Sequence, residues 1–173
     1  LAEPNVAAIH VDTARGSVWT AYGYQGGYID RFTRRTLQYD RNYDYRQGVG
    51  GPHVQSFFTR NGRLYFGDYT GFGYIDFGTG GRRHFIGDST MPYGDIKQIV
   101  PAGDSALYLA GIFGVLRYDE AAGSFVSLPG LDPGRVSCMA RQGDSLYLGI
   151  LGRGVRIYDL VAHTQQAPLL LQG

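Results

Sequence analysis

The sequence predicts an all-β fold, a β-propeller built from four four-stranded antiparallel blades. Three observations predict it: one short phrase occurs four times, its copies are evenly spaced, and turn-forming residues separate them. In each copy an aromatic residue lies among apolar residues, a glycine-bearing turn follows, and a second apolar run ends at an Asp. The copies are Val18 to Asp30, Leu64 to Asp76, Leu107 to Asp119 and Leu146 to Asp159.

The spacing of the copies identifies the repeat as a propeller blade. The anchoring aromatic residues are Trp19, Tyr65, Tyr108 and Tyr147. Consecutive anchors lie roughly 40 to 46 residues apart, which is the length of a repeat that folds into four short strands. Apolar residues on both sides of each anchor predict a strand that is covered on both faces, as a strand between neighbouring blades is.

Each repeat predicts four strands, beginning with an inner strand and ending with an outer strand. We expect the inner strands at 5–11, 54–59, 96–101 and 135–140, and the outer strands at 36–40, 82–86, 124–127 and roughly 165–170. Turns such as Arg60-Asn61-Gly62-Arg63 supply the backbone conformations of tight hairpins. The predicted blades of this single propeller region, 1–173, span 5–41, 54–88, 96–128 and 135–171, with no helix.

Composition excludes several classes of partner. The chain has 173 residues and a formal net charge of +1, which is too balanced for a nucleic-acid-binding surface. No apolar run approaches the roughly 20 residues of a membrane-spanning helix, so we expect no membrane insertion. Cys138 is the single cysteine and has no partner for an internal disulfide.

The repeat resembles that of the two-component-regulator propellers. There an inner strand precedes a D-x-x-G-x-L-W-I-G-T phrase, a G-G-L turn and an R-Y-D ending; the corresponding segments here are Asp12 to Asp30, Asn61 to Asp76, Asp104 to Asp119 and Asp144 to Asp159. The chain departs from that pattern because Trp is the anchor in one repeat only. The resemblance implies the periplasmic sensor part of a hybrid histidine kinase or a related bacterial propeller, and hence a periplasmic or extracellular location.

Four repeats leave open how the ring is completed. The resembling family has about seven blades in a ring, within the usual propeller range, and Cys138 has no partner to link the first and last blades. Three alternatives follow: the chain is part of a larger propeller, it pairs with itself, or it closes alone. An open arc would expose two apolar blade faces, which we expect to be covered.

The upper face of a propeller, its usual ligand site, is built from the loops between second and third strands and between blades. The candidate ligand-binding residues on these loops are Tyr22, Tyr24, Arg46, His53, Asp68, Tyr69, Phe72, Tyr93, Phe113 and Arg153. Tyrosine rings suit sugars or extended peptides, and Arg suits carboxylates, so a glycan or a peptide is the expected ligand. The alternative is that these aromatic residues pack between the blades.

The sequence predicts neither a catalytic site, nor a metal site, nor a cofactor. The four histidines do not share the spacing of metal ligands, and no Ser lies in a nucleophile elbow. A lyase would need a His and an acid on the upper face, and His53 with Asp68 is the pair that the sequence offers. The expected function is a non-enzymatic ligand-binding or sensing module; the alternatives are a structural propeller for protein–protein contacts and a lyase.

Overall fold

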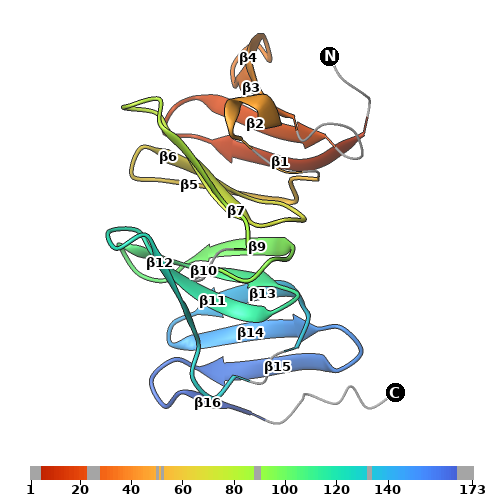
Figure 1. The fold of residues 1–173 in the computed structure, drawn as a ribbon, viewed down its shortest axis with the longest axis vertical. Helices are drawn as coiled ribbons and strands as arrows, with labels where there is room; N and C mark the ends of the chain where they lie inside the picture. Colours follow the sequence, from red (N-terminus) through yellow and green to blue (C-terminus); the bar gives the residue numbers. More distant parts are fainter. Residues whose placement is uncertain are drawn as a thin grey trace. The chain divides into compact units, whose positions relative to one another are not determined.

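The computed structural model describes residues 5–22, 28–49, 51, 53–87, 91–131 and 134–166. Its strands form four antiparallel sheets, each made of four consecutive strands (Figure 1). Among the described residues, the helical structure is one 3-10 turn, η1 (Tyr45–Gln47). The chain divides into two compact units, Leu1–Ile96 and Lys97–Gly173.

Each sheet is one blade, and the predicted fold class is confirmed. Blade 1 comprises β1 (Val6–Asp12), β2 (Ser17–Tyr22), β3 (Ile29–Thr33) and β4 (Tyr39–Tyr43). Blade 2 comprises β5 (Ser56–Arg60), β6 (Arg63–Gly67), β7 (Phe72–Asp76) and β8 (Arg82–Phe85). Blade 3 comprises β9 (Ile96–Pro101), β10 (Ala106–Gly111), β11 (Gly114–Asp119) and β12 (Ser124–Ser127). Blade 4 comprises β13 (Val136–Gln142), β14 (Ser145–Ile150), β15 (Gly154–Asp159) and β16 (Thr164–Gln165).

The outer strand of blade 1 lies three residues later than the sequence predicts. It was expected at 36–40, but β4 covers Tyr39–Tyr43. The cause is the turn that precedes it: the backbone N–H and the hydroxyl of Thr33 both donate to the carbonyl oxygen of Gln38, at 2.9 and 3.0 Å. These bonds hold residues 34–38 in the connection, so pairing with β3 begins only at Tyr39.

The four aromatic anchors occupy equivalent positions, as their shared register predicts. Each lies in the second strand of its blade and pairs with a residue of the third strand; the pairs are Trp19 with Arg31, Tyr65 with Tyr74, Tyr108 with Arg117 and Tyr147 with Ile157. The first three anchors are buried, whereas Tyr147 is half-buried.

The core of the first unit lies between blade 1 and blade 2. Trp19 of β2 stacks on Phe77, with ring centroids 5.5 Å apart, and packs in one cluster with Leu64 and Phe66 of β6. The guanidinium of Arg31 lies over the Trp19 ring, 5.5 Å from its centroid. Because side chains alternate along a strand, Trp19 faces blade 2, whereas Leu64 and Phe66, on either side of the anchor Tyr65, face blade 1.

The second unit repeats this arrangement between blade 3 and blade 4. Tyr108 and Val115 of blade 3 share a buried cluster with Leu146, Leu148 and Tyr158 of blade 4. The hydroxyl of Tyr158 donates to the carbonyl oxygen of Pro129 at 2.5 Å, which satisfies the polar end of a fully buried ring. The anchor therefore plays the same packing role in both units.

Replacing Trp19 with Ala is expected to lower the free energy of unfolding by about 3–5 kcal/mol, because it removes a fully buried ring from the core between two blades. Tyr108→Ala should act in the same way in the second unit. Urea unfolding followed by circular dichroism measures both effects. Tyr39→Ala, at a half-exposed position on β4, is the control and should change stability little; an equal loss in the control would contradict the assigned core.

Candidate functional site

A fully buried carboxylate lies at the end of β6, where three loops of the first unit meet. Asp68 follows Gly67 directly and has no exposed surface. Its Oδ1 accepts hydrogen bonds from the backbone N–H and the hydroxyl of Thr70, both at 2.7 Å, and from the backbone N–H of Gly71 at 2.9 Å. These bonds fix the turn between β6 and β7.

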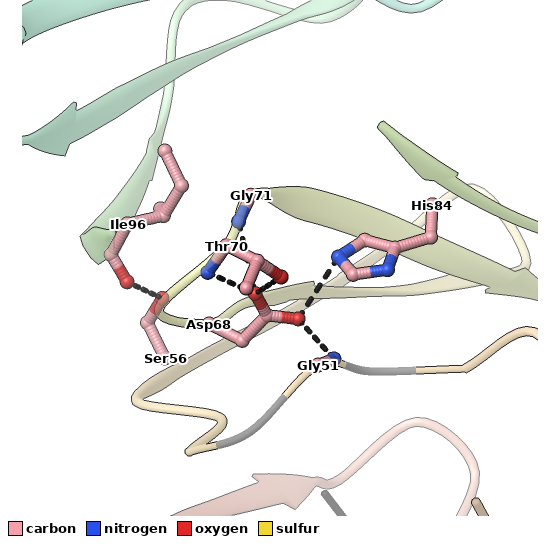
Figure 2. Close-up of polar contacts among 7 residues, drawn as sticks. All are labelled: Gly51, Ser56, Asp68, Thr70, Gly71, His84 and Ile96. Carbon is pink, nitrogen blue, oxygen red and sulfur yellow. Dashed lines mark hydrogen bonds and ion pairs between the residues drawn. The ribbon is translucent and has the colours of Figure 1, made fainter. Parts of the chain in front are cut away.

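The other carboxylate oxygen reaches two segments that are distant in sequence. Oδ2 accepts a hydrogen bond from the backbone N–H of Gly51 at 2.5 Å, and it lies 2.9 Å from Nε2 of His84 in β8 (Figure 2). The His84 contact is short but is not aligned as a straight hydrogen bond. Asp68 thereby ties the connection between blades 1 and 2 to the outer strand of blade 2.

The backbone of Asp68 adds a third connection. Its N–H donates to the carbonyl oxygen of Gly71 at 3.0 Å, and its carbonyl oxygen accepts the N–H of Ile96 at 2.9 Å. Ser56 donates its hydroxyl to the Ile96 carbonyl oxygen at 3.4 Å (Figure 2). The segment that leaves blade 2 is therefore held at the same point as the one that enters it.

Glycines allow this close packing. A Cβ atom at Gly71 would overlap the carbonyl oxygen of Phe85, and one at Gly51 would overlap the hydroxyl of Thr70. Both overlaps involve atoms that the Asp68 network or the β8 backbone holds in place. Larger residues at these two positions are therefore incompatible with the observed loops.

The charge of Asp68 is stabilised within the protein. Burial raises the pKa of the carboxyl group, but the contact with His84 and the charge of its imidazole, together with the bonds from Gly51 and Thr70, outweigh that effect. The pKa of Asp68 therefore lies below its usual range. A carboxylate surrounded by donors in this way acts as a structural anion.

The anchored loops display aromatic residues to solvent. The His53 ring stacks on Tyr69, with centroids 4.5 Å apart and planes 19° apart. Tyr69, in the turn that Asp68 fixes, is 46% exposed, and Tyr93, in the connection that ends at Ile96, is 64% exposed. Flat, exposed rings on connections with fixed ends can contact a ligand without a large ordering cost.

The other candidates separate into buried and exposed groups. Asp68, Tyr22 and Phe72 are buried, and Phe72 stacks between Tyr65 and Phe85. The protein itself covers these three side chains, so little of their surface is available to a ligand. Arg46 of η1 is exposed. Phe113 is half-buried and Arg153 is exposed, both in the second unit; Tyr24 lies outside the described residues.

The lyase alternative pairs His53 with Asp68, but the histidine beside Asp68 is His84. His53 instead stacks on Tyr69. The sequence contains a signal for this network: Asp68 is an acidic residue at a position where repeats one, three and four have Tyr22, Gly111 and Ile150.

No group of three metal-ligating side chains occurs in the described parts of the chain. Nor is any helix within those parts long and apolar enough to cross a membrane.

Comparison with solved structures supports the fold independently. The extracellular domain of BT3049 from B. thetaiotaomicron, a protein assigned as a hybrid two component system, is similar with a TM-score of 0.82 and 16% identity, covering 100% of this chain and 25% of that one. The extracellular domain of BT4673 from the same organism, assigned as a one component system, gives 0.77 and 15%, covering 96% and 23%. The RRP9 WD40 repeats give 0.74 and 16%, covering 94% and 50%.

These similarities define the class of protein as a β-propeller, and the resemblance to two-component-regulator propellers is confirmed at the level of the fold. No protein-family model and no curated protein matches the sequence. The chain spans about a quarter of the length of the two extracellular domains. At this low identity the likeness shows the architecture alone, and the function depends on the residues of the site.

Replacing Asp68 with Asn should lower the free energy of unfolding by about 3–5 kcal/mol, because it removes one partner of a buried charged network. The amide also brings a donor to a place where four hydrogen-bond donors already point at the side-chain oxygens and Nε2 of His84 lies close by. Urea unfolding measures the loss. Asp44→Asn, on a half-buried carboxylate of the connection before β5, is the matched control. An Asp68→Asn variant as stable as the wild type would contradict the structural role of Asp68.

The stability that Asp68 contributes should depend on pH in a defined direction. Its pKa in the folded protein is lowered, so its contribution is complete above the unfolded value of about 3.9 and is lost as the pH falls through the folded value. The difference in unfolding free energy between wild type and Asp68→Asn should therefore shrink below about pH 4. Urea unfolding at a series of pH values tests this; a constant difference down to the acid limit would contradict it.

Proposed function

We propose that the chain is a non-enzymatic ligand-binding or sensing module of a bacterial periplasmic or surface protein. The observation that carries the proposal is the group of loops anchored at Asp68, which presents the stacked His53–Tyr69 pair and the exposed Tyr93. The ligand is a glycan or a peptide, since both offer apolar surfaces that flat aromatic rings cover well. The extracellular origin of the similar BT3049 and BT4673 domains supports the location.

The four blades belong, in this proposal, to a ring with more blades. The similar extracellular domains are about four times as long as this chain, which supports a larger assembly. The repeat architecture supports it too, because each blade needs a neighbour on both faces. Other blades then cover the open faces of blades 1 and 4, while the aromatic loops remain accessible at the end of the ring.

A ligand screen tests the binding function. Soluble glycans and short peptides are added to the purified chain, and a ligand that binds the folded state raises the melting temperature by mass action. Tyr69→Ala should abolish the shift caused by a positive ligand, because it removes the ring that stacks on His53. Val126→Ala, which removes exposed apolar surface from β12, should preserve the shift.

Two results would contradict the proposal. One is the absence of any shift at millimolar ligand in both classes, which would favour a structural role in assembly. The other is an equal loss of binding in Tyr69→Ala and Val126→Ala, which would place the ligand elsewhere or show that its effect is not specific.

A further inference from the structure

The turn between β3 and β4 places two adjacent arginines beside an open pocket. The pocket has a volume of about 450 Å³ and is lined by Gly16, Thr33, Arg34 and Arg35. Within the part of the chain that the structure describes, the guanidinium groups of Arg34 and Arg35 make no ion pair, whereas Arg31 pairs with Asp40. The pocket therefore carries two positive charges that the described residues do not neutralise.

Each blade has an equivalent turn between its third and fourth strands. The residue after the third strand donates its backbone N–H to a carbonyl oxygen in the turn between the first two strands, over 2.8 to 3.0 Å; the pairs are Arg34 with Gly16, Phe77 with Gly62, Glu120 with Ser105 and Leu160 with Asp144. Three residues later, each turn has a residue with a φ between 51° and 70°; these residues are Leu37, Gly80, Gly123 and His163. The four turns therefore share their backbone conformation at both points.

In blades 2, 3 and 4 an Asp carboxylate binds two backbone N–H groups of this turn. The Asp is the last residue of the third strand, and its Oδ1 accepts from the residues two and three positions later, at 2.8 to 3.0 Å. The sets are Asp76 with Gly78 and Thr79, Asp119 with Ala121 and Ala122, and Asp159 with Val161 and Ala162.

These bonds favour a negative charge at the turn. The N–H of Thr79 contributes most to lowering the pKa of Asp76 to about 2. In blades 3 and 4 the equivalent N–H groups, of Ala122 and Ala162, are the largest cause that lowers the pKa of the Asp. Because a hydrogen bond to the charged form stabilises that form, the backbone of this turn binds a carboxylate in preference to a neutral group.

Blade 1 has Thr33 where the other blades have this Asp. Thr33 occupies the same register position, paired with the first residue of the second strand. Its hydroxyl donates to the carbonyl oxygen of Gln38, and no described residue accepts a hydrogen bond from the backbone N–H of Arg35 or Thr36. The two donors that hold a carboxylate in the other blades therefore remain open in blade 1, beside the pocket with the two arginines.

We propose that the pocket at the turn between β3 and β4 binds a small dicarboxylate, and that one of its carboxylates takes the place of the missing Asp side chain. The N–H groups of Arg35 and Thr36 donate to that carboxylate, and the guanidinium groups of Arg34 and Arg35 balance the two negative charges. The site is distinct from the aromatic loops: the equivalent turn of blade 2 begins at Asp76, at the opposite end of β7 from the turn that Asp68 fixes.

An NMR titration of the nitrogen-15-labelled 173-residue chain with succinate tests the site. The amide resonances of Arg35 and Thr36 should shift in a saturable manner, because their N–H groups gain an acceptor. The amides of Gly78 and Thr79 already donate to Asp76 and should not move. Succinamide has the same length but no charge, and it should cause no shift.

A substitution at Thr33 gives a sharper test. Thr33→Asp supplies the missing carboxylate from the chain itself, as in the other three blades, and should abolish the shifts that succinate causes. Thr33→Ser keeps a hydroxyl and adds no charge, so it should bind succinate like the wild type. Circular dichroism spectra like that of the wild type show that both variants fold.

The arginines are tested separately. Arg34→Gln and Arg35→Gln should each raise the dissociation constant of succinate roughly three- to tenfold, as expected for the loss of one exposed charged donor. Arg83→Gln removes an exposed positive charge from β8 in blade 2 and is the matched control. It should leave the dissociation constant unchanged, whereas an equal loss in this control would show a dependence on net charge and overturn the site.

Three further results would overturn the proposal. One is the absence of shifts at Arg35 and Thr36 with millimolar succinate. Another is an undiminished response in Thr33→Asp, because succinate would then not occupy the place of the Asp side chain. The third is an equal response to inorganic phosphate, which would show a site for oxyanions in general. None of these results depends on Tyr69, so the ligand screen of the aromatic loops is judged separately.

Discussion

Contact between blades is the interaction on which the rest of the structure depends. A second strand with apolar side chains on both faces cannot remain stable with one face in water. Trp19 illustrates the requirement, since its ring stacks on Phe77 of the neighbouring blade and also contacts the guanidinium of Arg31 from its own blade. The repeat length, the hairpin turns and the shared register all bring such an anchor to the same place in each blade.

Asp68 is the point at which blade 2 departs from this apolar rule. A buried carboxylate is costly unless donors surround it, and here the backbone of two loops and a hydroxyl donate to Asp68, while the imidazole of His84 lies beside it. The polar network thus replaces hydrophobic packing at one end of the blade. The network fixes the segments that carry His53 and Tyr69, so a buried residue determines where these surface side chains lie.

The sequence predicted what repeats and missed what depends on a single turn. Period and alternation were sufficient for the fold class and the register of the anchors, because every blade obeys the same packing requirement. They could not place β4, since the turn bonds of Thr33 are local to blade 1. Nor could they pair Asp68 with His84 or show that Tyr22 and Phe72 are buried, because loop burial depends on contacts between segments that the repeat does not encode.

The position of Trp19 also makes this residue an intrinsic fluorescence probe of the protein. It is the single tryptophan of the chain, and it is fully buried between blades 1 and 2. Emission excited selectively from indole therefore reports on separation of these two blades, whereas the second unit contributes tyrosine signals alone. Loosening of one unit can thus be distinguished from global denaturation without attaching a label.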